Sequence, residues 1–301
     1  MPVKDFKKVS IIIPTYNGGV LFKSVLDNVF NQDLRPDEVI VIDSSSTDGT
    51  EKIAKDYPVR FVKIKQTEFG HGKTRNYGAK LAKGEYVVFL TQDAVPRNIF
   101  WLKNLVEPLK SKKIAGSFSR QIARDEAVPM EKFFYSKMYP DSSKIITQGD
   151  IKSQNILFSN ASSAIQRSFI LKHPFAENIL MSEDLAWALQ MLREGYKIDY
   201  KADSQVTHSH DTSLKMLFKR YFDFGVSHNE IAWGPSYFGK GFATFLQENI
   251  YLVTHGKMSW IPRSLSYNFA KFLGLFIGKH NIILPRNLKQ RFTTYYKGYW
   301  T

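Results

Sequence analysis

The chain has acidic side chains at two places where a carboxylate could bind a ligand or transfer a proton. The first is Asp93. It follows a short apolar run, Tyr86–Leu90, which is bounded by Gly84 and Pro96 and is therefore typical of a buried strand. A carboxylate just past the end of such a strand lies where open α/β sheets bind their ligands. An aspartate in this position also shapes turns. The strand end alone therefore leaves two roles open for Asp93, a turn residue or a ligand.

The second place is the acidic pair Glu183 and Asp184 at the start of an expected helix. Apolar residues recur from Leu185 to Leu192 at helical spacing, and Ser182 is a suitable N-cap. Acids are common in a first helical turn because they complement the helix dipole. The alternative is that one of the two is an ionised general base, held in place by the rigid start of the helix.

Two histidines, His208 and His210, follow an expected strand at Gln205–Thr207. In an extended segment their side chains share one face, so together they could bind a metal ion. Histidines are more often merely hydrogen-bonded. The pair is therefore a candidate for metal ligation, with that simpler alternative left open.

The elements that must position these groups alternate between strand and helix from Val9 to Leu90. The strands are expected at Val9–Ile13, Glu38–Ile42, Val59–Ile64 and Tyr86–Leu90, with helices from Leu21, around Ile53–Ala54 and over Arg75–Lys83. This order predicts a mostly parallel sheet with helices on both faces. Polar clusters follow three of the strands, at Pro14–Gly19, Asp43–Thr50 and Thr91–Asp93. They should meet at one edge of the sheet, as in a nucleotide site.

The sequence lacks the glycine patterns of two common nucleotide-binding classes. No G-x-G-x-x-G follows the first strand, and no G-x-x-x-x-G-K-[ST] occurs. A dehydrogenase and a P-loop enzyme are therefore disfavoured. Beyond Pro108 the pattern loosens, with a strand expected at Ile114–Ile122, a helix at Glu131–Tyr139, a polar loop at Asp141–Gln154, brief strands at Ile198–Tyr200 and Gln205–Thr207, and helices after Leu214.

Composition limits the class of protein. The 301 residues are 43% hydrophobic and contain no cysteine, which allows a large core and excludes disulfides and thiolate metal sites. No apolar run approaches the roughly 20 residues that span a bilayer, and the start of the chain does not look like a signal peptide. We therefore expect a cytoplasmic location.

The net charge of +14 is concentrated at the end of the chain. Eight Lys and Arg residues and no acid follow Glu248, so this tail carries +8. Such a tail could bind nucleic acid, anionic lipid or a phosphorylated glycan carrier. Its helical apolar stripe, Leu265–Ile277, could pack on the domain, mediate a dimer or lie on a membrane.

The order and spacing of the motifs carry a resemblance. PTYNGG after the first strand, VIVIDSSSTDGT, KTRNYGA, the single-Asp motif TQDA and the later SEDL resemble a GT-A glycosyltransferase of family 2. FGHGKTRNYGA and VTHSHDTSLKMLFKRYFDFG are more closely similar to the bacterial rhamnosyltransferases of that family, which build cell-surface polysaccharides. Many relatives carry two or three acids where this chain has only Gln92-Asp93-Ala94, and the single-Asp form is common among rhamnosyltransferase-like members.

The resemblance implies a fold, a reaction and a set of site residues. The fold is a GT-A, Rossmann-like domain over residues 1–212, with its nucleotide-sugar half at about 1–100 and its acceptor half at about 101–212, followed by a helical extension over 213–301. The reaction uses a nucleotide-diphosphate sugar and a divalent metal, Mg²⁺ or Mn²⁺, with inversion at the anomeric carbon. The implied donor-binding residues are Pro14, Thr15, Tyr16, Asn17, Asp43, Arg75, Gln92 and Asp93. The implied metal ligands are Asp93 with His208 or His210, the catalytic base is Asp184, and Asn160 and Glu183 would face the acceptor or the sugar.

Three hypotheses follow. The first is a rhamnosyltransferase at the cytoplasmic face of a membrane, which takes dTDP-rhamnose and extends a lipid-linked or polysaccharide acceptor. The second keeps the fold but uses a UDP-hexose or UDP-N-acetylhexosamine donor. The third, a basic nucleic-acid-binding protein, is disfavoured because acids line the strand-end loops that a polyanion would approach. We therefore expect no nucleic-acid partner.

Overall fold

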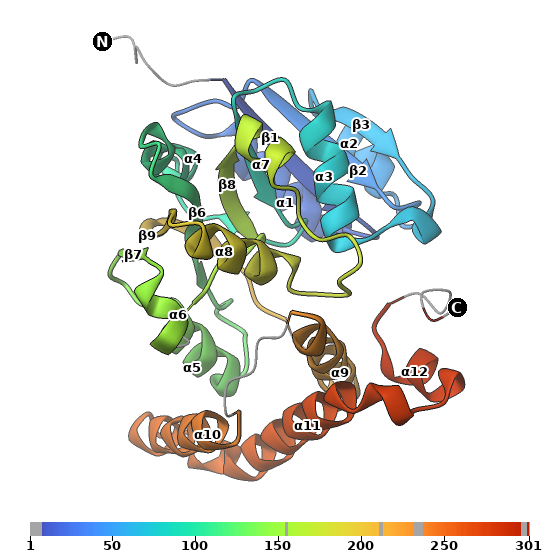
Figure 1. The fold of residues 1–301 in the computed structure, drawn as a ribbon, viewed down its shortest axis with the longest axis vertical. Coiled ribbons are helices and arrows are strands. Elements are labelled where there is room, and N and C mark those ends of the chain that lie inside the picture. The colour runs from blue at the N-terminus through green and yellow to red at the C-terminus, as the bar shows by residue number, and fades with distance from the viewer. Residues whose placement is uncertain (1–7, 154–155, 211–212, 232–236, 296–299, 301) are drawn as a thin grey trace. The chain divides into compact units, whose positions relative to one another are not determined.

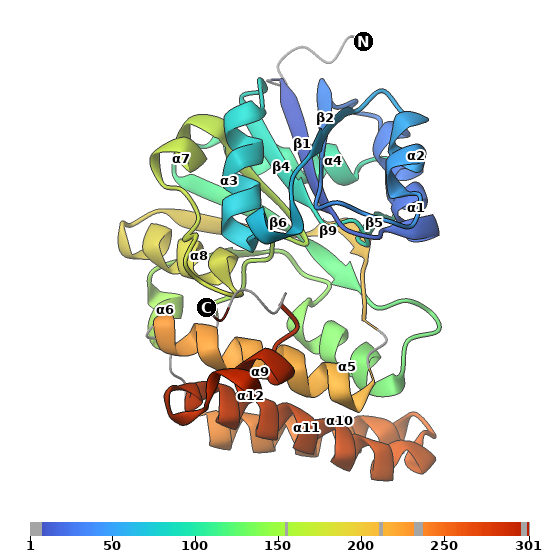
Figure 2. The same cartoon turned by 90° about the vertical axis from the view of Figure 1, so that its right-hand side faces the viewer.

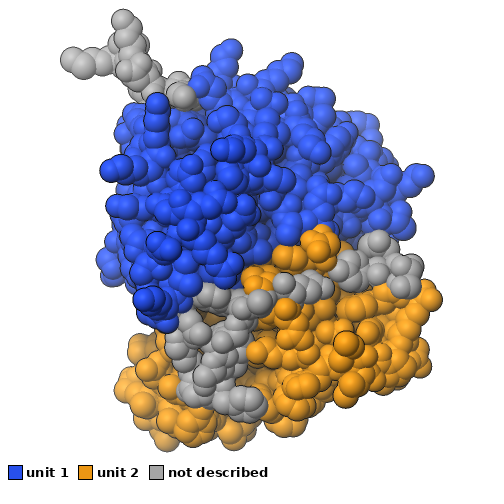
Figure 3. All heavy atoms as spheres, viewed as in Figure 1, with its two compact units in different colours: residues 1–122, 139–177, 183–208 blue, residues 123–138, 178–182, 209–301 orange. Residues whose placement is uncertain are grey.

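The computed structural model describes residues 8–153, 156–210, 213–231, 237–295 and 300 (Figure 1). The chain forms two compact units, which Figure 3 colours separately. Unit 1 comprises Met1–Ile122, Tyr139–Glu177 and Glu183–His208, and unit 2 comprises Ala123–Met138, Asn178–Ser182 and Ser209–Thr301. The boundary expected after residue 212 falls beside residues 211–212, which lie outside the described part of the chain.

Unit 1 is built on one mixed sheet. Its strands are β1 (Val9–Thr15), β2 (Glu38–Asp43), β3 (Arg60–Lys63), β4 (Tyr86–Leu90), β5 (Val95–Pro96), β6 (Ile114–Ile122), β7 (Lys144–Ile146), β8 (Ser162–Gln166) and β9 (Lys197–Thr207). They are ordered β3-β2-β1-β4-β8-β6-β9-β5, and β7 pairs with β9. The strands β3-β2-β1-β4 are parallel, as predicted, whereas β8 runs antiparallel to both β4 and β6. The carboxyl ends of β1, β2 and β4 therefore meet at one edge.

Helices cover both faces of this sheet (Figure 2). The helices of unit 1 are α1 (Gly19–Phe30), α2 (Thr50–Lys55), α3 (His71–Leu81), α4 (Trp101–Val106), α6 (Gly149–Ser153), α7 (Arg167–Lys172) and α8 (Glu183–Arg193). Successive side chains of a strand point to opposite faces, so Ile11 and Ile13 join the core under α1 and α4. Ile12 lies on the other face, where Gly78 of α3 approaches so closely that an added Cβ would be 2.5 Å from it.

Two expectations for the acceptor half were wrong. Asp141–Gln154 is not a loop throughout, because Lys144–Ile146 pairs with β9 and α6 follows. The two brief strands expected at 198–200 and 205–207 are parts of one strand, β9. Its register shifts against β6 at this point, and the buried hydroxyl of Ser204 hydrogen-bonds the Ser119 hydroxyl at 2.8 Å. Ser204, which lies between the two expected strands, is thus hydrogen-bonded inside the sheet.

Unit 2 is helical. Its helices are α5 (Pro129–Met138), α9 (Leu214–Glu230), α10 (Tyr237–Thr254), α11 (Ile261–Lys279) and α12 (Arg286–Phe292). Helices α9 and α11 pack tightly against each other through glycines. An added Cβ on Gly278 would lie 2.1 Å from the Phe222 carbonyl oxygen, and one on Gly225 would lie 2.4 Å from the Leu275 carbonyl oxygen. In the described part of the chain, no helix is both long enough and apolar enough to cross a membrane.

The close packing of α9 and α11 predicts how a glycine substitution changes the free energy of unfolding. Gly278→Ala should lower the free energy of unfolding by about 1–3 kcal/mol or more, because the backbone of α9 blocks the new methyl group. Gly241→Ala in α10 is the matched control, since no atom of the described residues lies within 4 Å of its added Cβ. The control should be neutral or stabilising by up to about 1 kcal/mol. Urea denaturation of both variants measures the difference, and equal stabilities would contradict the packing described.

Candidate active site

The loop after β1 is clamped to the loop after β4. The side-chain amide of Gln92 accepts a hydrogen bond from the backbone N–H of Tyr16 at 2.8 Å and donates one to the Tyr16 carbonyl at 3.0 Å. Pro14 and Thr15 pair with Ile42 and Asp43 of β2. The ring of Tyr16 stays 42% exposed at this edge, where it is available to a ligand. Gln92 thereby fixes the backbone of Tyr16 beside Asp93.

The same loop is also held against the loop after β2. The Ser46 hydroxyl accepts from the Asn17 backbone N–H at 2.8 Å, and the Asn17 side-chain oxygen accepts from the Thr47 N–H at 2.9 Å. Asn17 has a left-handed φ of 49°, a conformation that asparagine tolerates better than most residues. Asp43 is fully buried, and its carboxylate accepts hydrogen bonds from the backbone N–H and the hydroxyl of Ser46. Three strand ends thus form one braced edge.

Asp93 lies at this edge beside His208. Its Oδ1 is 3.6 Å from His208 Nε2, a separation wider than a hydrogen bond. The other ring nitrogen, Nδ1, lies 2.7 Å from the side-chain oxygen of Gln121. The amide nitrogen of Gln121 donates to Tyr139 and Ser159, so its oxygen faces the ring and accepts from Nδ1–H. This places a proton on Nδ1, and Nε2 is the ring nitrogen that faces Asp93.

His210 adds a third side chain that could bind a metal ion. Ligand atoms of Asp93, His208 and His210 all lie within 4.8 Å of one another. One carboxylate oxygen and two imidazole nitrogens form a donor set that suits a divalent transition metal such as Mn²⁺. The support of His208 by Gln121 is also what metal-binding histidines need, because the hydrogen bond on one nitrogen orients the other. These residues therefore fit a metal ion.

Glu183, the first residue of α8, is the centre of a buried polar network. Its carboxylate accepts from Arg75 at 3.0 Å and from the side chain of Asn160 at 3.1 Å. Burial disfavours its charge, but the positive charge of Arg75, that of His71 and the Asn160 hydrogen bond outweigh burial and lower the pKa of Glu183. Arg75 is itself 4% exposed. The pair holds the start of α8 against α3.

Asp184, the next residue, is the less buried of the two acids. It is partly exposed, while Glu183 is only 4% exposed. Its carboxylate accepts from the backbone N–H groups of Asn160 at 3.0 Å and Leu185 at 2.8 Å. Burial, followed by the adjacent negative charge of Glu183, raises the pKa of Asp184 to about 7. A carboxylate with such a pKa can exchange protons near neutral pH.

A short chain of backbone contacts links Asp184 to the end of β4. The Thr91 N–H donates to the Ala161 carbonyl at 3.1 Å, and the neighbouring residue, Asn160, donates its N–H to Asp184. Since Leu90 pairs with Ser162 of β8, the segment before β8 runs beside the end of β4. Asp93 and Asp184 are thus positioned by two adjoining segments, the end of β4 and the segment before β8.

A comparison with known families decides the class of protein. Residues 10–173 match the model of "Glycosyl transferase family 2". The chain belongs to this family. It is therefore a glycosyltransferase, and the resemblance inferred from its motifs is confirmed.

Curated relatives match this glycosyltransferase over almost its whole length. The O-antigen chain rhamnosyltransferase RfbN of Salmonella typhimurium is 37% identical over 97% of the chain and 96% of its own length. The O-antigen chain rhamnosyltransferase WbaN of Salmonella anatum is 36% identical over 97% and 95%. Among solved structures, the mannosyltransferase PcManGT of Pyrobaculum calidifontis, in complex with GDP-Man and Mn²⁺, has a TM-score of 0.58 at 20% identity, over 99% of this chain and 86% of that one. The similarity to this mannosyltransferase structure confirms the GT-A-like fold that the sequence predicts.

The glycosyltransferase brings most of the predicted site residues together. Pro14–Asn17, Asp43, Gln92 and Asp93 meet at the sheet edge, and His208 and His210 lie beside Asp93. Arg75, Asn160, Glu183 and Asp184 form the second cluster. The structure brings these residues together, but the role predicted for each of them stays a prediction. The side chains of Arg75 and Asp43 are buried and engaged inside the protein. The sequence analysis missed Gln121, which supports His208. The only sequence feature that could have indicated it is a polar side chain next to the end of a strand.

Proposed function

We propose that this chain is an inverting rhamnosyltransferase of cell-surface glycan synthesis. It transfers L-rhamnose from dTDP-rhamnose to a lipid-linked or polysaccharide acceptor. The observation that carries the proposal is the similarity to two O-antigen chain rhamnosyltransferases over 97% of the chain, at 37% and 36% identity. The braced sheet edge with Asp93 and the partly exposed Asp184 supply the two chemical groups that such a reaction needs.

The donor binds at the polar edge of the sheet. The exposed side chains of Tyr16 and Asn17 line the nucleotide, with the buried Thr15 and Asp43 beneath them, and Asp93 with His208 and His210 would hold the metal. When bound, a divalent cation neutralises the negative charge that develops on the leaving diphosphate. The nitrogen ligands favour Mn²⁺, while Mg²⁺ would rely on Asp93 and the phosphate oxygens. Gln92 keeps the nucleotide loop in register with Asp93 because it bonds both backbone groups of Tyr16.

The acceptor reacts on the side of Asp184. Inversion requires the acceptor hydroxyl to attack the anomeric carbon opposite the departing diphosphate. As the new C–O bond forms, the carboxylate of Asp184 takes the hydroxyl proton. Its position is fixed by two backbone N–H donors, and Glu183 cannot substitute for it because that side chain is buried and ion-paired with Arg75.

The donor assignment is tested by binding and turnover of nucleotide sugars. We expect dTDP-rhamnose with Mn²⁺ to raise the thermal midpoint, since a ligand that binds only the native state stabilises it. UDP-glucose and UDP-N-acetylglucosamine are the matched comparisons. Slow release of rhamnose from dTDP-rhamnose should accompany the shift. Stabilisation and hydrolysis confined to a UDP-sugar would contradict the rhamnose assignment and leave the glycosyltransferase chemistry intact.

We also propose that unit 2 docks on the anionic cytoplasmic surface of a membrane. Apolar side chains stand exposed on one face of α10 and one face of α11: Phe242, Leu246, Ile250 and Val253, and Leu265, Phe269, Phe272 and Phe276. No acid follows Glu248, so the surrounding charge is positive. Exposed apolar area with positive charge favours the interface of anionic lipid.

Vesicle binding tests this second proposal. Phe269→Ser, which changes a side chain that is 63% exposed, should weaken co-sedimentation with phosphatidylglycerol vesicles. Ser266→Ala, an exposed change on the same helix, is the control. Equal vesicle binding by both variants would contradict membrane docking. If Phe269→Ser instead converted a dimer to a monomer in solution, the apolar face would be a homodimer interface.

A further inference from the structure

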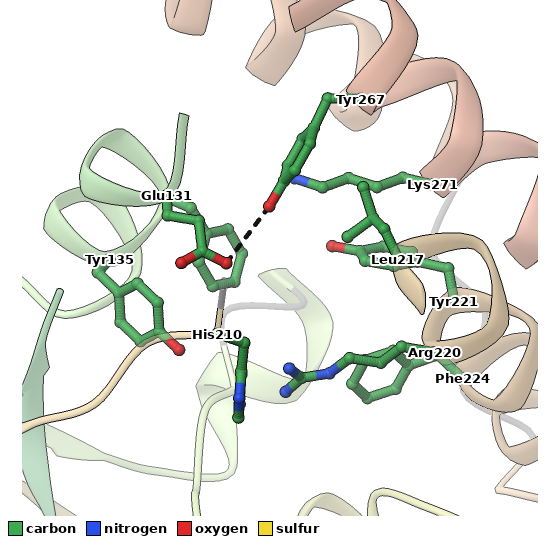
Figure 4. Close-up of a pocket in the computed structure, with 10 residues that line it drawn as sticks. Glu131, Tyr135, His210, Leu217, Arg220, Tyr221, Phe224, Tyr267 and Lys271 are labelled. Carbon is green, nitrogen blue, oxygen red and sulfur yellow. Dashed lines mark hydrogen bonds between the residues drawn. The ribbon is translucent and has the colours of Figure 1, made fainter. Parts of the chain in front are cut away.

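Unit 2 contains a cavity of about 90 Å³ that the reaction described so far does not use. Its lining comes from α5, α9, α11 and the segment that begins at Ser209. Figure 4 shows Arg220 of α9 and Lys271 of α11 reaching in from one side, with Glu131 and Tyr135 of α5 on the other. Since about 10–15 Å³ of such volume is enough to hold one water molecule, the cavity has room for several waters or one small polar group.

The two cations of the cavity are held by aromatic rings. The Lys271 ammonium lies 4.3 Å from the centre of the Tyr267 ring and 5.7 Å from that of Tyr221. The Arg220 guanidinium lies 5.8 Å from the centre of the Phe224 ring. Within the part of the chain that the structure describes, neither cation has a carboxylate within 4.0 Å. Ring contacts of this kind position a cation and leave N–H donors for a ligand.

Glu131, a further polar residue of the cavity, could accept hydrogen bonds from the hydroxyl groups of a ligand. Glu131 is 7% exposed and accepts a hydrogen bond from the Tyr267 hydroxyl at 3.3 Å. Its carboxylate would repel an anion placed against it, but it can accept hydrogen bonds from a ligand's hydroxyls. Among the lining residues that the structure describes, two cations and one carboxylate give an excess of positive charge, even when His210 is neutral. A ligand that carries an anionic group next to hydroxyls fits this pattern.

We propose that this cavity binds a phosphate group of the acceptor, at the point where a glycan is joined to a phosphorylated carrier. The proposal rests on the proposed glycosyl transfer and names the acceptor's class. Arg220 and Lys271 bind the phosphate oxygens, and Glu131 accepts from a hydroxyl of the attached sugar. In the sequence, the lining residue His210 follows His208 after Ser209 alone.

Binding of inorganic pyrophosphate, measured by calorimetry in EDTA, tests the proposal without the metal that the donor site would need. Arg220→Gln and Lys271→Gln should each weaken pyrophosphate binding at least about tenfold, the low end for losing a hydrogen bond to a charged group. Arg263→Gln and Lys289→Gln are matched controls, because these cations also lie over rings, at 5.6 Å from Trp260 and 5.4 Å from Trp300, and neither lines the cavity. The controls should bind as the wild type does.

A third variant changes binding in the opposite direction. Glu131→Gln removes the negative charge of the cavity and should tighten pyrophosphate binding severalfold, which a folding defect would not do. It keeps the proposal testable if Arg220→Gln or Lys271→Gln fails to fold. The proposal is overturned if the wild type does not bind pyrophosphate, if all variants bind it equally, or if Glu131→Gln weakens binding.

Two further readouts separate this proposal from the others. Metal-dependent hydrolysis of dTDP-rhamnose should be unchanged in Arg220→Gln and Lys271→Gln, while the KM for a lipid-linked acceptor rises. If the wild type hydrolyses no nucleotide sugar, the proposed function fails whatever the cavity binds. If the two variants lose binding to phosphatidylglycerol vesicles at an unchanged acceptor KM, the cavity is a lipid headgroup site and the acceptor assignment is overturned.

Discussion

Asp184→Asn is expected to lower the rate of glycosyl transfer by about 10²- to 10⁴-fold, the usual contribution of a general base. The amide can still accept hydrogen bonds from the backbone N–H groups of Asn160 and Leu185, but it cannot take a proton from the acceptor hydroxyl. Affinity for the donor should be unchanged, because the contacts proposed for the nucleotide lie at the ends of β1, β2 and β4. Steady-state transfer to a glycan acceptor measures the rate, and equilibrium binding of dTDP measures the affinity.

Asp203→Asn is the matched control for this change. Asp203 also carries a carboxylate in unit 1, but its side chain is 54% exposed and contacts Lys201 at 3.3 Å. Its amide variant should keep the wild-type transfer rate. Turnover of Asp184→Asn within a fewfold of the wild type would remove Asp184 from the role of base.

The raised pKa of Asp184 sets the direction of the pH dependence. A general base works only when ionised, and burial together with the charge of Glu183 raises the pKa of Asp184 to about 7. For the free enzyme, kcat/KM should therefore climb about tenfold per pH unit below pH 7 and level off above it. Asp184→Asn should lose this ascending limb. A wild-type profile that is flat between pH 5 and about pH 8 would contradict the assignment.

The second large effect is expected for Asp93→Ala. This variant should lose at least about a hundredfold in transfer rate and should no longer respond to added Mn²⁺, because metal stabilisation of a leaving group is worth several kcal/mol. The ring of His208 should stay in place, since Gln121 holds its Nδ1 at 2.7 Å. Activity after removal of metal by EDTA, followed by titration with Mn²⁺ or Mg²⁺, is the measurement.

Asp125→Ala, which removes an exposed aspartate of unit 2, is the control for loss of a carboxylate. It should keep the full response to Mn²⁺. If EDTA leaves the wild type fully active, the metal role of Asp93 fails. A strong Mn²⁺ response that persists in Asp93→Ala would also contradict it.

The nucleotide half of unit 1 could be predicted because its signals are local. The sequence predicts a strand at Tyr86–Leu90, which is β4 with the same bounds, and in the acceptor half it predicts β6 at Ile114–Ile122 equally well. Buried parallel strands appear as apolar runs, and their polar carboxyl ends must meet at one edge. The position of Asp93 beside that edge follows from those two facts.

What could not be predicted depends on contacts between distant segments. Gln121 supports His208 across 87 positions, and Arg75 pairs with Glu183 across 108, so no local pattern marks either partner. Strand β8 is antiparallel to β4, and the strand Lys144–Ile146 pairs with β9. The short segments that form these strands carry no sequence pattern that predicts such pairings. The cavity around Arg220 and Lys271 likewise needs three helices to be brought together.

One measurement separates the two roles on which the account depends. Calorimetric binding of dTDP, with and without Mn²⁺, should show an affinity gain with the metal in the wild type and in Asp184→Asn, and no gain in Asp93→Ala. That result would place Asp93 on the donor and Asp184 on the acceptor. A metal-dependent gain that survives in Asp93→Ala, or that disappears in Asp184→Asn, would contradict the division of labour between the two carboxylates.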